Sequence, residues 1–116
     1  MKAVLEELNQ EVGIKGSMVI TPDGIMVASA LGPDLEEDLV AAIVSSVLVA
    51  AKRALSQLKA ADGLNSCILT ADNGKIMFYD MGNAFLVVVA DTSLRLDTSI
   101  IAIRSAIFRL KNRRVA

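Results

Sequence analysis

The sequence contains no histidine, no tryptophan and a single cysteine among its 116 residues. Without histidine, it lacks the commonest general base and the commonest metal ligand of proteins. The lone cysteine, Cys67, excludes an intramolecular disulfide and every metal site built from several cysteines. No other acid-base constellation outlines a catalytic centre. We therefore expect no catalytic residue, no metal and no cofactor, and a protein that is not itself an enzyme.

Aromatic residues and net charge are also scarce, at 3% of the sequence and -1 respectively. A chain without a strong overall field does not attract nucleic acid. Basic residues do crowd the segment from Arg104 to Arg114, but no aromatic platform for stacking bases accompanies them. Basic residues are also favoured at the C-terminal end of any helix. We expect no nucleic-acid partner, and contact of this segment with anionic lipid or an acidic protein surface is left as an alternative.

Uncharged segments are shorter than a membrane span requires, because the longest, Leu39 to Ala51, falls below the ~18 apolar residues needed. The opening sequence MKAVLEELNQEV lacks the apolar run of a signal peptide. We therefore expect a cytoplasmic protein with no transmembrane segment. Hydrophobic residues nevertheless make up 53% of the chain, and the mean hydropathy is +0.52. This surplus of small aliphatic residues predicts a surface that a partner covers.

Periodicity and turn signals predict a helix followed by a hairpin in the first part of the chain. An apolar stripe predicts a short helix that ends near Val12 and is stopped at Gly13. Strands over residues 17–20 and 25–30 flank the sequence TPDG, in which proline presets φ and glycine supplies the left-handed position. This pattern predicts a β-hairpin.

Three further strands are predicted at residues 65–71, 75–80 and 84–90, separated by the turn sequences DNG and MGN. The Asn-Gly pair is the strongest short-range hairpin signal, so the three strands should form an antiparallel meander. Residues 85–90 are apolar at every position, which is typical of a central strand covered on both faces. We therefore expect helices on both sides of the sheet.

A long helix is predicted between the two groups of strands. Gly32-Pro33-Asp34 should open it, because proline suits a first helical turn and acids are favoured there, and it should reach about Ala60. The arc expected to pack on the sheet comprises Val40, Ile43, Val44, Val47, Leu48, Ala51, Leu55 and Leu58. The opposite arc has charged ends but only small residues across its middle, so a second body is expected to lie against it.

The last segment has capping residues at 91–93 and an apolar stripe spaced by three and four residues through Leu96, Ile100, Ile103, Ile107 and Leu110. It predicts a final helix, whose apolar stripe is the second cover of the sheet. The whole chain, residues 1–116, is thus predicted to be one α+β domain in the order α-ββ-α-βββ-α.

This order, with GSMVITPDGIMVAS in the first hairpin, EEDLVAAI opening the long helix and a final helix after LVVVA, resembles the roadblock (dynein light-chain) family. Within it, the likeness is to the bacterial and archaeal MglB-like members, and it covers essentially the whole chain. The resemblance implies a roadblock/profilin-like three-layer fold. Its five-stranded antiparallel sheet would carry the long helix on one face and the two terminal helices on the other.

The resemblance also implies a homodimer, in which the third strands pair edge to edge and the long helices lie side by side. The dimer interface would then include Leu39, Ile43, Ala50, Ser66, Cys67, Ile68, Leu69 and Thr70. The residues themselves support this at one point, because strand 65–71 has no Lys, Glu or Pro to guard an exposed edge. Strand 25–30 is equally uncharged, so the sequence alone leaves open which edge pairs.

Similarity to MglB-like proteins further implies that the long-helix face binds a Ras-like (MglA-like) small GTPase, modulates its GTP hydrolysis and serves polarity or motility. The implied contact residues are Asp38, Ala42, Ser45, Ser46, Val49 and Arg53. Alternatives remain at this point, and a small-molecule sensor is one of them, although no convergent polar groups in the sequence indicate a pocket. The same residues could mediate only helix packing within the dimer, or the protein could be a structural adaptor of a motor or signalling complex, insensitive to nucleotide.

Overall fold

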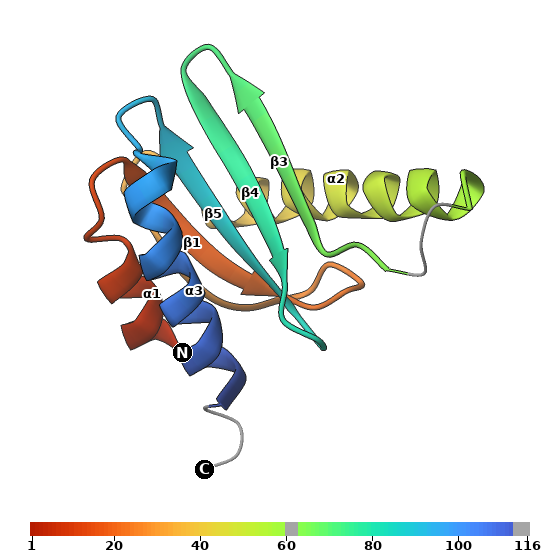
Figure 1. Cartoon of the computed structure of the whole chain (residues 1–116), viewed down its shortest axis with the longest axis horizontal. Coiled ribbons are helices and arrows are strands. Elements are labelled where there is room, and N and C mark those ends of the chain that lie inside the picture. Colours follow the sequence, from red (N-terminus) through yellow and green to blue (C-terminus); the bar gives the residue numbers. More distant parts are fainter. Residues whose placement is uncertain (60–62, 113–116) are drawn as a thin grey trace.

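The computed structural model describes residues 1–59 and 63–112, apart from the side chains of residues 96 and 98 (Figure 1). Helices and strands follow the predicted order α-ββ-α-βββ-α. Their bounds are α1 (Lys2–Leu8), β1 (Ile14–Ile20), β2 (Met26–Leu31), α2 (Glu37–Gln57), β3 (Ser66–Ala71), β4 (Gly74–Asp80), β5 (Phe85–Asp91) and α3 (Leu96–Asn112).

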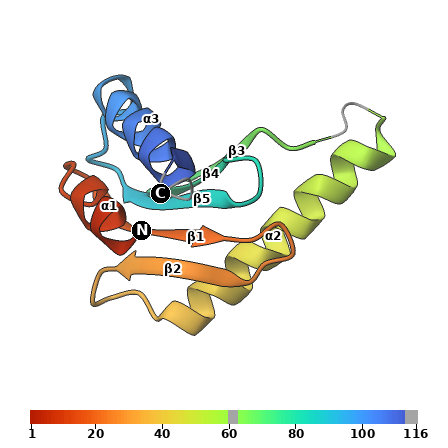
Figure 2. The ribbon, with the colours of Figure 1, turned by 90° about the horizontal axis from the view of Figure 1, so that it is seen from below.

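The five strands form one antiparallel sheet in the order β2-β1-β5-β4-β3. Strand β5 lies in the middle, as its continuous apolar sequence predicts, and β2 and β3 are the two edges. Helix α2 covers one face of the sheet obliquely, and α1 and α3 lie side by side on the other (Figure 2). The three-layer α+β fold predicted from the sequence is therefore confirmed.

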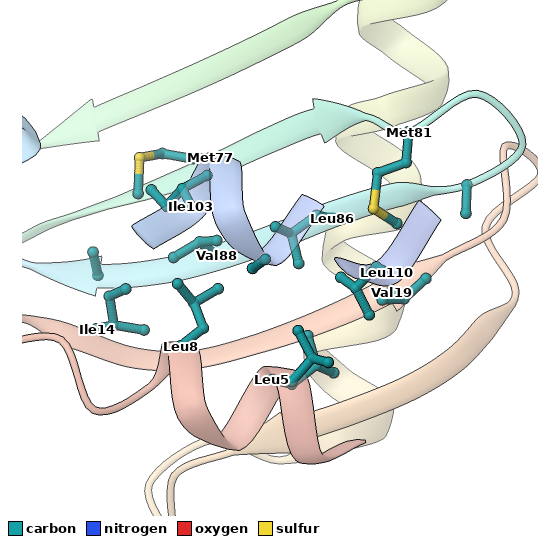
Figure 3. Close-up of a cluster of buried hydrophobic side chains, with 14 of the residues drawn as sticks. Leu5, Leu8, Ile14, Val19, Met77, Met81, Leu86, Val88, Ile103 and Leu110 are labelled. Carbon is teal, nitrogen blue, oxygen red and sulfur yellow. The ribbon is translucent and has the colours of Figure 1, made fainter. Parts of the chain in front are cut away.

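Alternating residues of the strands build two separate cores, because successive side chains of a strand point to opposite faces. The core under α1 and α3 contains Leu5, Leu8, Ile14, Val19, Met77, Met81, Leu86, Val88, Ile103 and Leu110 (Figure 3). The core under α2 contains Met18, Ile20, Val44, Leu48, Leu64, Phe78, Phe85 and Val87. Packing of helices on both faces thus stabilises the sheet from either side.

Helix α1 is shorter than predicted, ending at Leu8 instead of near Val12. The chain must turn back here to enter β1, and Val12 consequently lies in the turn with 75% of its surface exposed. Gly13 has φ +94°, and a Cβ atom at this position would collide with the backbone nitrogen of Leu94. The predicted stop at Gly13 was therefore wrong: the helix has already ended at Leu8, residues 9–12 belong to the turn, and the glycine serves the close approach to Leu94.

Helix α2 also begins later than predicted, at Glu37 instead of near Pro33. The backbone N–H of Leu35 donates to the carbonyl oxygen of Gly32 at 3.1 Å, so the proline lies in a separate turn ahead of the helix. Described helical structure ends at Gln57, and the expected end at Ala60 lies outside the described residues. The acids that the sequence placed in the first helical turn are therefore divided between this turn and the helix.

Candidate functional site

Helix α2 buries only a narrow strip of its surface in the domain. Val44 and Leu48 are its fully buried residues, and Val40, Val47 and Leu55 pack partly against the same core. Two residues assigned by the sequence to the sheet-facing arc, Ile43 and Leu58, are instead exposed. Ile43 was also expected in the dimer interface, and its exposure leaves it available for that contact. Most of the helix surface therefore lies open.

The residues implied in partner binding lie along this open surface. Ser45, Ser46, Val49 and Arg53 come together with Ala50 around one shallow hollow. Ala42 and Asp38 lie outside the hollow, about one and two turns respectively nearer the N-terminal end than Ser46, and both are exposed. The surface thus has small residues at its centre, a carboxylate at one end and a guanidinium at the other. Such a shape permits close approach of a second body.

Ser45 differs from its neighbours because the β1–β2 turn lies against it. Its hydroxyl donates to the carbonyl oxygen of Gly24 at 3.4 Å, and the side chain is half-buried. Gly24 has φ +92°, and a Cβ atom there would collide with Ser45 Oγ. Ser45 therefore holds the turn close to α2, whereas Ser46 and Val49 present more of their surface to a partner.

One charged residue of the same turn, Asp23, lies near Lys52 of the helix. The Thr21 hydroxyl donates to Asp23 Oδ1 at 2.6 Å, and this bond, helped by the positive charge of Lys52, holds the pKa of Asp23 below its usual range. Asp23 is thus a fixed negative charge beside the open face of α2. Across residues 1–59 and 63–112, no three His, Cys, Asp or Glu side chains gather closely enough to hold a metal ion.

Strand β3 is the more open of the two sheet edges. Ser66, Ile68, Leu69 and Thr70 are exposed, and Cys67 is half-buried against the core under α2. In β2, by contrast, every residue except Val27 is at least half-buried, because α1 and α2 both contact that strand. The structure therefore distinguishes two edges that the sequence left equivalent.

Beyond this edge, α2 overhangs the sheet, and its C-terminal turns project past β3 (Figure 1). Leu58 follows Val40 by eighteen residues, which is about five whole turns, so both point to the same side of the helix. Val40 packs against the sheet, but Leu58 is 76% exposed. The sequence pattern identified the correct face of the helix, and it could not reveal that the sheet ends before Leu58.

An apolar strip on the α2 side of the sheet is the counterpart of this overhang. Leu69 pairs with Ile76, and Ile76 pairs with Val89, so the three side chains lie side by side on one face. They line an open hollow near the β3–β4 turn, and α2 crosses the sheet elsewhere. The sequence did not reveal this strip. Its three residues are all apolar, but only the strand register shows that they are cross-strand neighbours.

By length and composition alone, α2 is apolar enough to cross a bilayer. Val44 and Leu48 nevertheless lie fully buried against the sheet, and the helix is one layer of the fold. Only 11% of its apolar stretch is buried, so most of this apolar surface faces outward.

The layers and strand order described above are those of roadblock and profilin-like proteins. A family model described as Roadblock/LC7 domain matches residues 1–90, and the chain belongs to this family. A relative, the uncharacterized protein MJ0714 of Methanocaldococcus jannaschii, is 35% identical over 108 residues, which cover 93% of this chain and 91% of that protein.

Two solved structures illustrate the likeness. MglB of Myxococcus xanthus has a TM-score of 0.79 at 21% identity, over 96% of this chain and 91% of that chain. A Roadblock/LC7 domain from Streptomyces avermitilis has a TM-score of 0.82 at 10% identity, over 100% of this chain and 98% of that chain. At these identities the two structures establish the shared fold.

Proposed function

We propose that the protein is a cytoplasmic homodimer that binds a Ras-like small GTPase on its α2 face and modulates GTP hydrolysis by that partner. The observation that carries the proposal is the open surface of α2, with small residues between Asp38 and Arg53. The MglB-like fold supports the choice of partner. In this proposal the GTPase supplies the catalytic groups, and the dimer holds them in place.

Dimerisation is supported by the match between the overhang and the apolar strip. A twofold axis perpendicular to the sheet would pair two β3 strands antiparallel and join the sheets into one. The same axis carries the projecting end of the partner's α2 back over the sheet, toward the strip formed by Leu69, Ile76 and Val89. Leu58, which has no sheet beneath it in its own chain, would then be covered. Burial of these side chains is favourable because it removes apolar surface from water.

The two α2 helices would lie beside each other in this dimer. Leu39, Ile43 and Ala50 are exposed along one flank of the helix and would face the partner helix. The hollow around Ser46 and Val49 lies on the neighbouring surface. Ala50 borders both surfaces, so a GTPase resting across the two helices would contact the hollow at the margin of the helix–helix contact.

The test is a titration of the protein against a Ras-like GTPase of its source organism, loaded with GDP or with a non-hydrolysable GTP analogue. A regulator of hydrolysis must favour the active conformation, because a partner shifts only an equilibrium for which it has differential affinity. We expect preferential binding of the GTP-like form, with two chains per GTPase. Equal binding of both forms would contradict the regulator and favour a nucleotide-insensitive adaptor.

Replacement of Ser46 by arginine is expected to abolish this interaction. Ser46 is exposed, and its hydroxyl donates to the carbonyl oxygen of Ala42 in its own helix, at 3.0 Å, so the variant should fold normally. The longer, charged side chain would overpack the contact or bury an unpaired charge. We expect affinity for the GTPase to fall roughly tenfold or more, measured by the same titration.

Ser105→Arg is the matched control, because Ser105 is also an exposed helical serine but lies in α3 on the other face of the sheet. The control should bind as the parent protein does. Similar losses in both variants would show that the added charge, and not its position on α2, causes the effect.

A further inference from the structure

The outer surface of α3 carries two exposed apolar side chains for which neither the fold nor the proposed function accounts. Ile101 is 72% exposed and Phe108 is 68% exposed. They are seven residues apart, or about two helical turns, so they form one ridge along the helix. The other two phenylalanines, Phe78 and Phe85, are buried. Phe108 is thus an aromatic side chain placed at the surface in a chain that has very few.

Basic side chains accompany the ridge. Arg104 and Lys111, also seven residues apart, lie exposed along one flank, and within the described residues neither forms an ion pair. Arg109, on the other flank, is held by Glu7 of α1, with Nη1 and Oε2 2.7 Å apart. In the sequence, residues 104–114 contain five basic residues and no acid. The ridge therefore combines apolar groups with uncompensated positive charge.

We propose that this ridge of α3, defined by Ile101, Arg104, Phe108 and Lys111, binds the surface of anionic membranes. Apolar and aromatic side chains beside arginine and lysine are the combination with which helices lie in the headgroup region of a bilayer. Each basic residue near such a surface adds electrostatic attraction. The bilayer is pliable, so a convex ridge requires no preformed groove in its partner.

Charge argues against a second copy of this chain on the same surface. A symmetric contact between two α3 ridges would bring Arg104 and Lys111 of one copy close to those of the other, and like charges would repel. An anionic surface instead complements all of them.

The location of α3 makes the two surfaces compatible. Helix α3 lies on the face of the sheet opposite α2 (Figure 2), so a membrane-bound molecule keeps its α2 surface accessible. In the dimer, which rests on the proposed function, a twofold axis perpendicular to the sheet places both α3 ridges on the same side. Both ridges could then contact one membrane. Once the first ridge is bound, the second is held close to the same membrane and binds more readily.

A tryptophan reporter tests insertion directly, because the chain has no tryptophan of its own. Phe108→Trp is expected to shift its fluorescence emission to shorter wavelength when vesicles of phosphatidylcholine and phosphatidylglycerol are added. Ile25→Trp is the control, since Ile25 is 62% exposed but lies in the β1–β2 turn near α2. It should show no shift. An unshifted Phe108→Trp, or an equal shift with vesicles of phosphatidylcholine alone, would overturn the proposal.

Co-sedimentation with the same vesicles tests the charges. Replacing Arg104 and Lys111 together by serine should lower the affinity for these vesicles roughly tenfold or more, because two attractive charges are lost. The control, Lys52→Ser with Lys59→Ser, removes the same charge from α2 and from the turn after it, and should bind as the parent does. Equal binding of both double variants would contradict the proposal. A shift of Phe108→Trp that grows with protein concentration in the absence of vesicles would point instead to a contact between copies.

Discussion

Ser17 is a polar side chain within the core between α1 and the sheet. Its hydroxyl donates to Asn9 Oδ1 at 2.8 Å, and Asn9 Nδ2 donates to the carbonyl oxygen of Ala30 at 2.6 Å. These bonds link the end of α1 to β1 and β2. Buried polar groups need such partners, because an unsatisfied one loses its interaction with water without compensation.

We expect Asn9→Ala to lower the free energy of unfolding by about 1–3 kcal/mol, because Ser17 would lose its nearest hydrogen-bond partner. Urea denaturation followed by circular dichroism would measure the change. Gln10→Ala, at the exposed neighbouring position, should alter stability by less than about 0.5 kcal/mol. Equal effects of the two substitutions would contradict a role for this polar link.

Asp91 is expected to titrate at unusually low pH. The hydroxyl and backbone N–H of Ser93 donate to its carboxylate, the latter at 2.8 Å, and with Lys15 nearby they hold the pKa of Asp91 below its ordinary value. Because the pKa is lower in the folded state, the carboxylate contributes stability at neutral pH, and this contribution is lost as pH falls through the folded pKa. NMR titration of the Asp91 carboxyl carbon in the parent and in Ser93→Ala measures this. The pKa should rise in the variant, and an unchanged pKa would be inconsistent with this cause.

At the scale of single elements, the two edge strands make the sharpest comparison. Both are uncharged along the sequence, yet β3 is largely exposed while α1 and α2 cover much of β2. Unguarded edges pair with other strands wherever they are accessible. Accessibility therefore favours β3 as the edge that pairs in the proposed dimer.

Ile68→Lys should shift the proposed dimer toward monomer, because a charge would be placed at the pairing edge. Ile68 is already exposed, so the monomer itself should remain folded. Ile25→Lys, adjoining the other edge, should leave the dimer intact. Sedimentation velocity over a range of concentrations distinguishes the species. Dissociation by Ile25→Lys alone would assign pairing to β2.

Element types followed from the sequence more reliably than their ends. The apolar periodicity of α2, the Asn-Gly turn before β4 and the continuous apolar run of β5 were each sufficient for their predictions. The predicted start of α2 at Pro33 was wrong because proline also suits a tight turn ahead of a helix. Ile43 was misplaced because it lies at the margin of the predicted arc, on the same exposed flank as Leu39 and Ala50. Leu58 was misplaced for a different reason. Periodicity gives the direction of a side chain, but the width of the sheet decides whether anything lies beneath it.

At the scale of the whole molecule, the proposed dimer brings the exposed parts of α2 and β3 from two copies together. We expect Leu58→Glu to weaken the dimer without lowering the stability of the monomer, because the side chain is 76% exposed in one chain and would be buried by the other. Sedimentation equilibrium gives the dimer dissociation constant, and far-ultraviolet circular dichroism reports the fold. Ile101→Glu, equally exposed but on α3, is the matched control. An unchanged dissociation constant would contradict the proposed packing of the overhang.

The candidate site was only partly predictable. Small residues on the outer arc of α2 identified its open surface, and the structure groups Ser46, Val49 and Arg53 there as expected. The contact of Ser45 with Gly24, and the strip of Leu69, Ile76 and Val89, depend on how distant segments meet. Helical periodicity carries no information about such contacts.

The open edge of β3 has a consequence for the choice of partner among related chains. Main-chain amides and carbonyls are identical in every member of a family, so strand pairing alone cannot distinguish self from relative. Where a cell makes several members, discrimination must come from side chains, such as Leu58 and the strip formed by Leu69, Ile76 and Val89. Chains whose overhang and strip match in volume would form mixed dimers. Such dimers would present two different α2 faces on one platform and so recognise a combination that neither chain recognises alone.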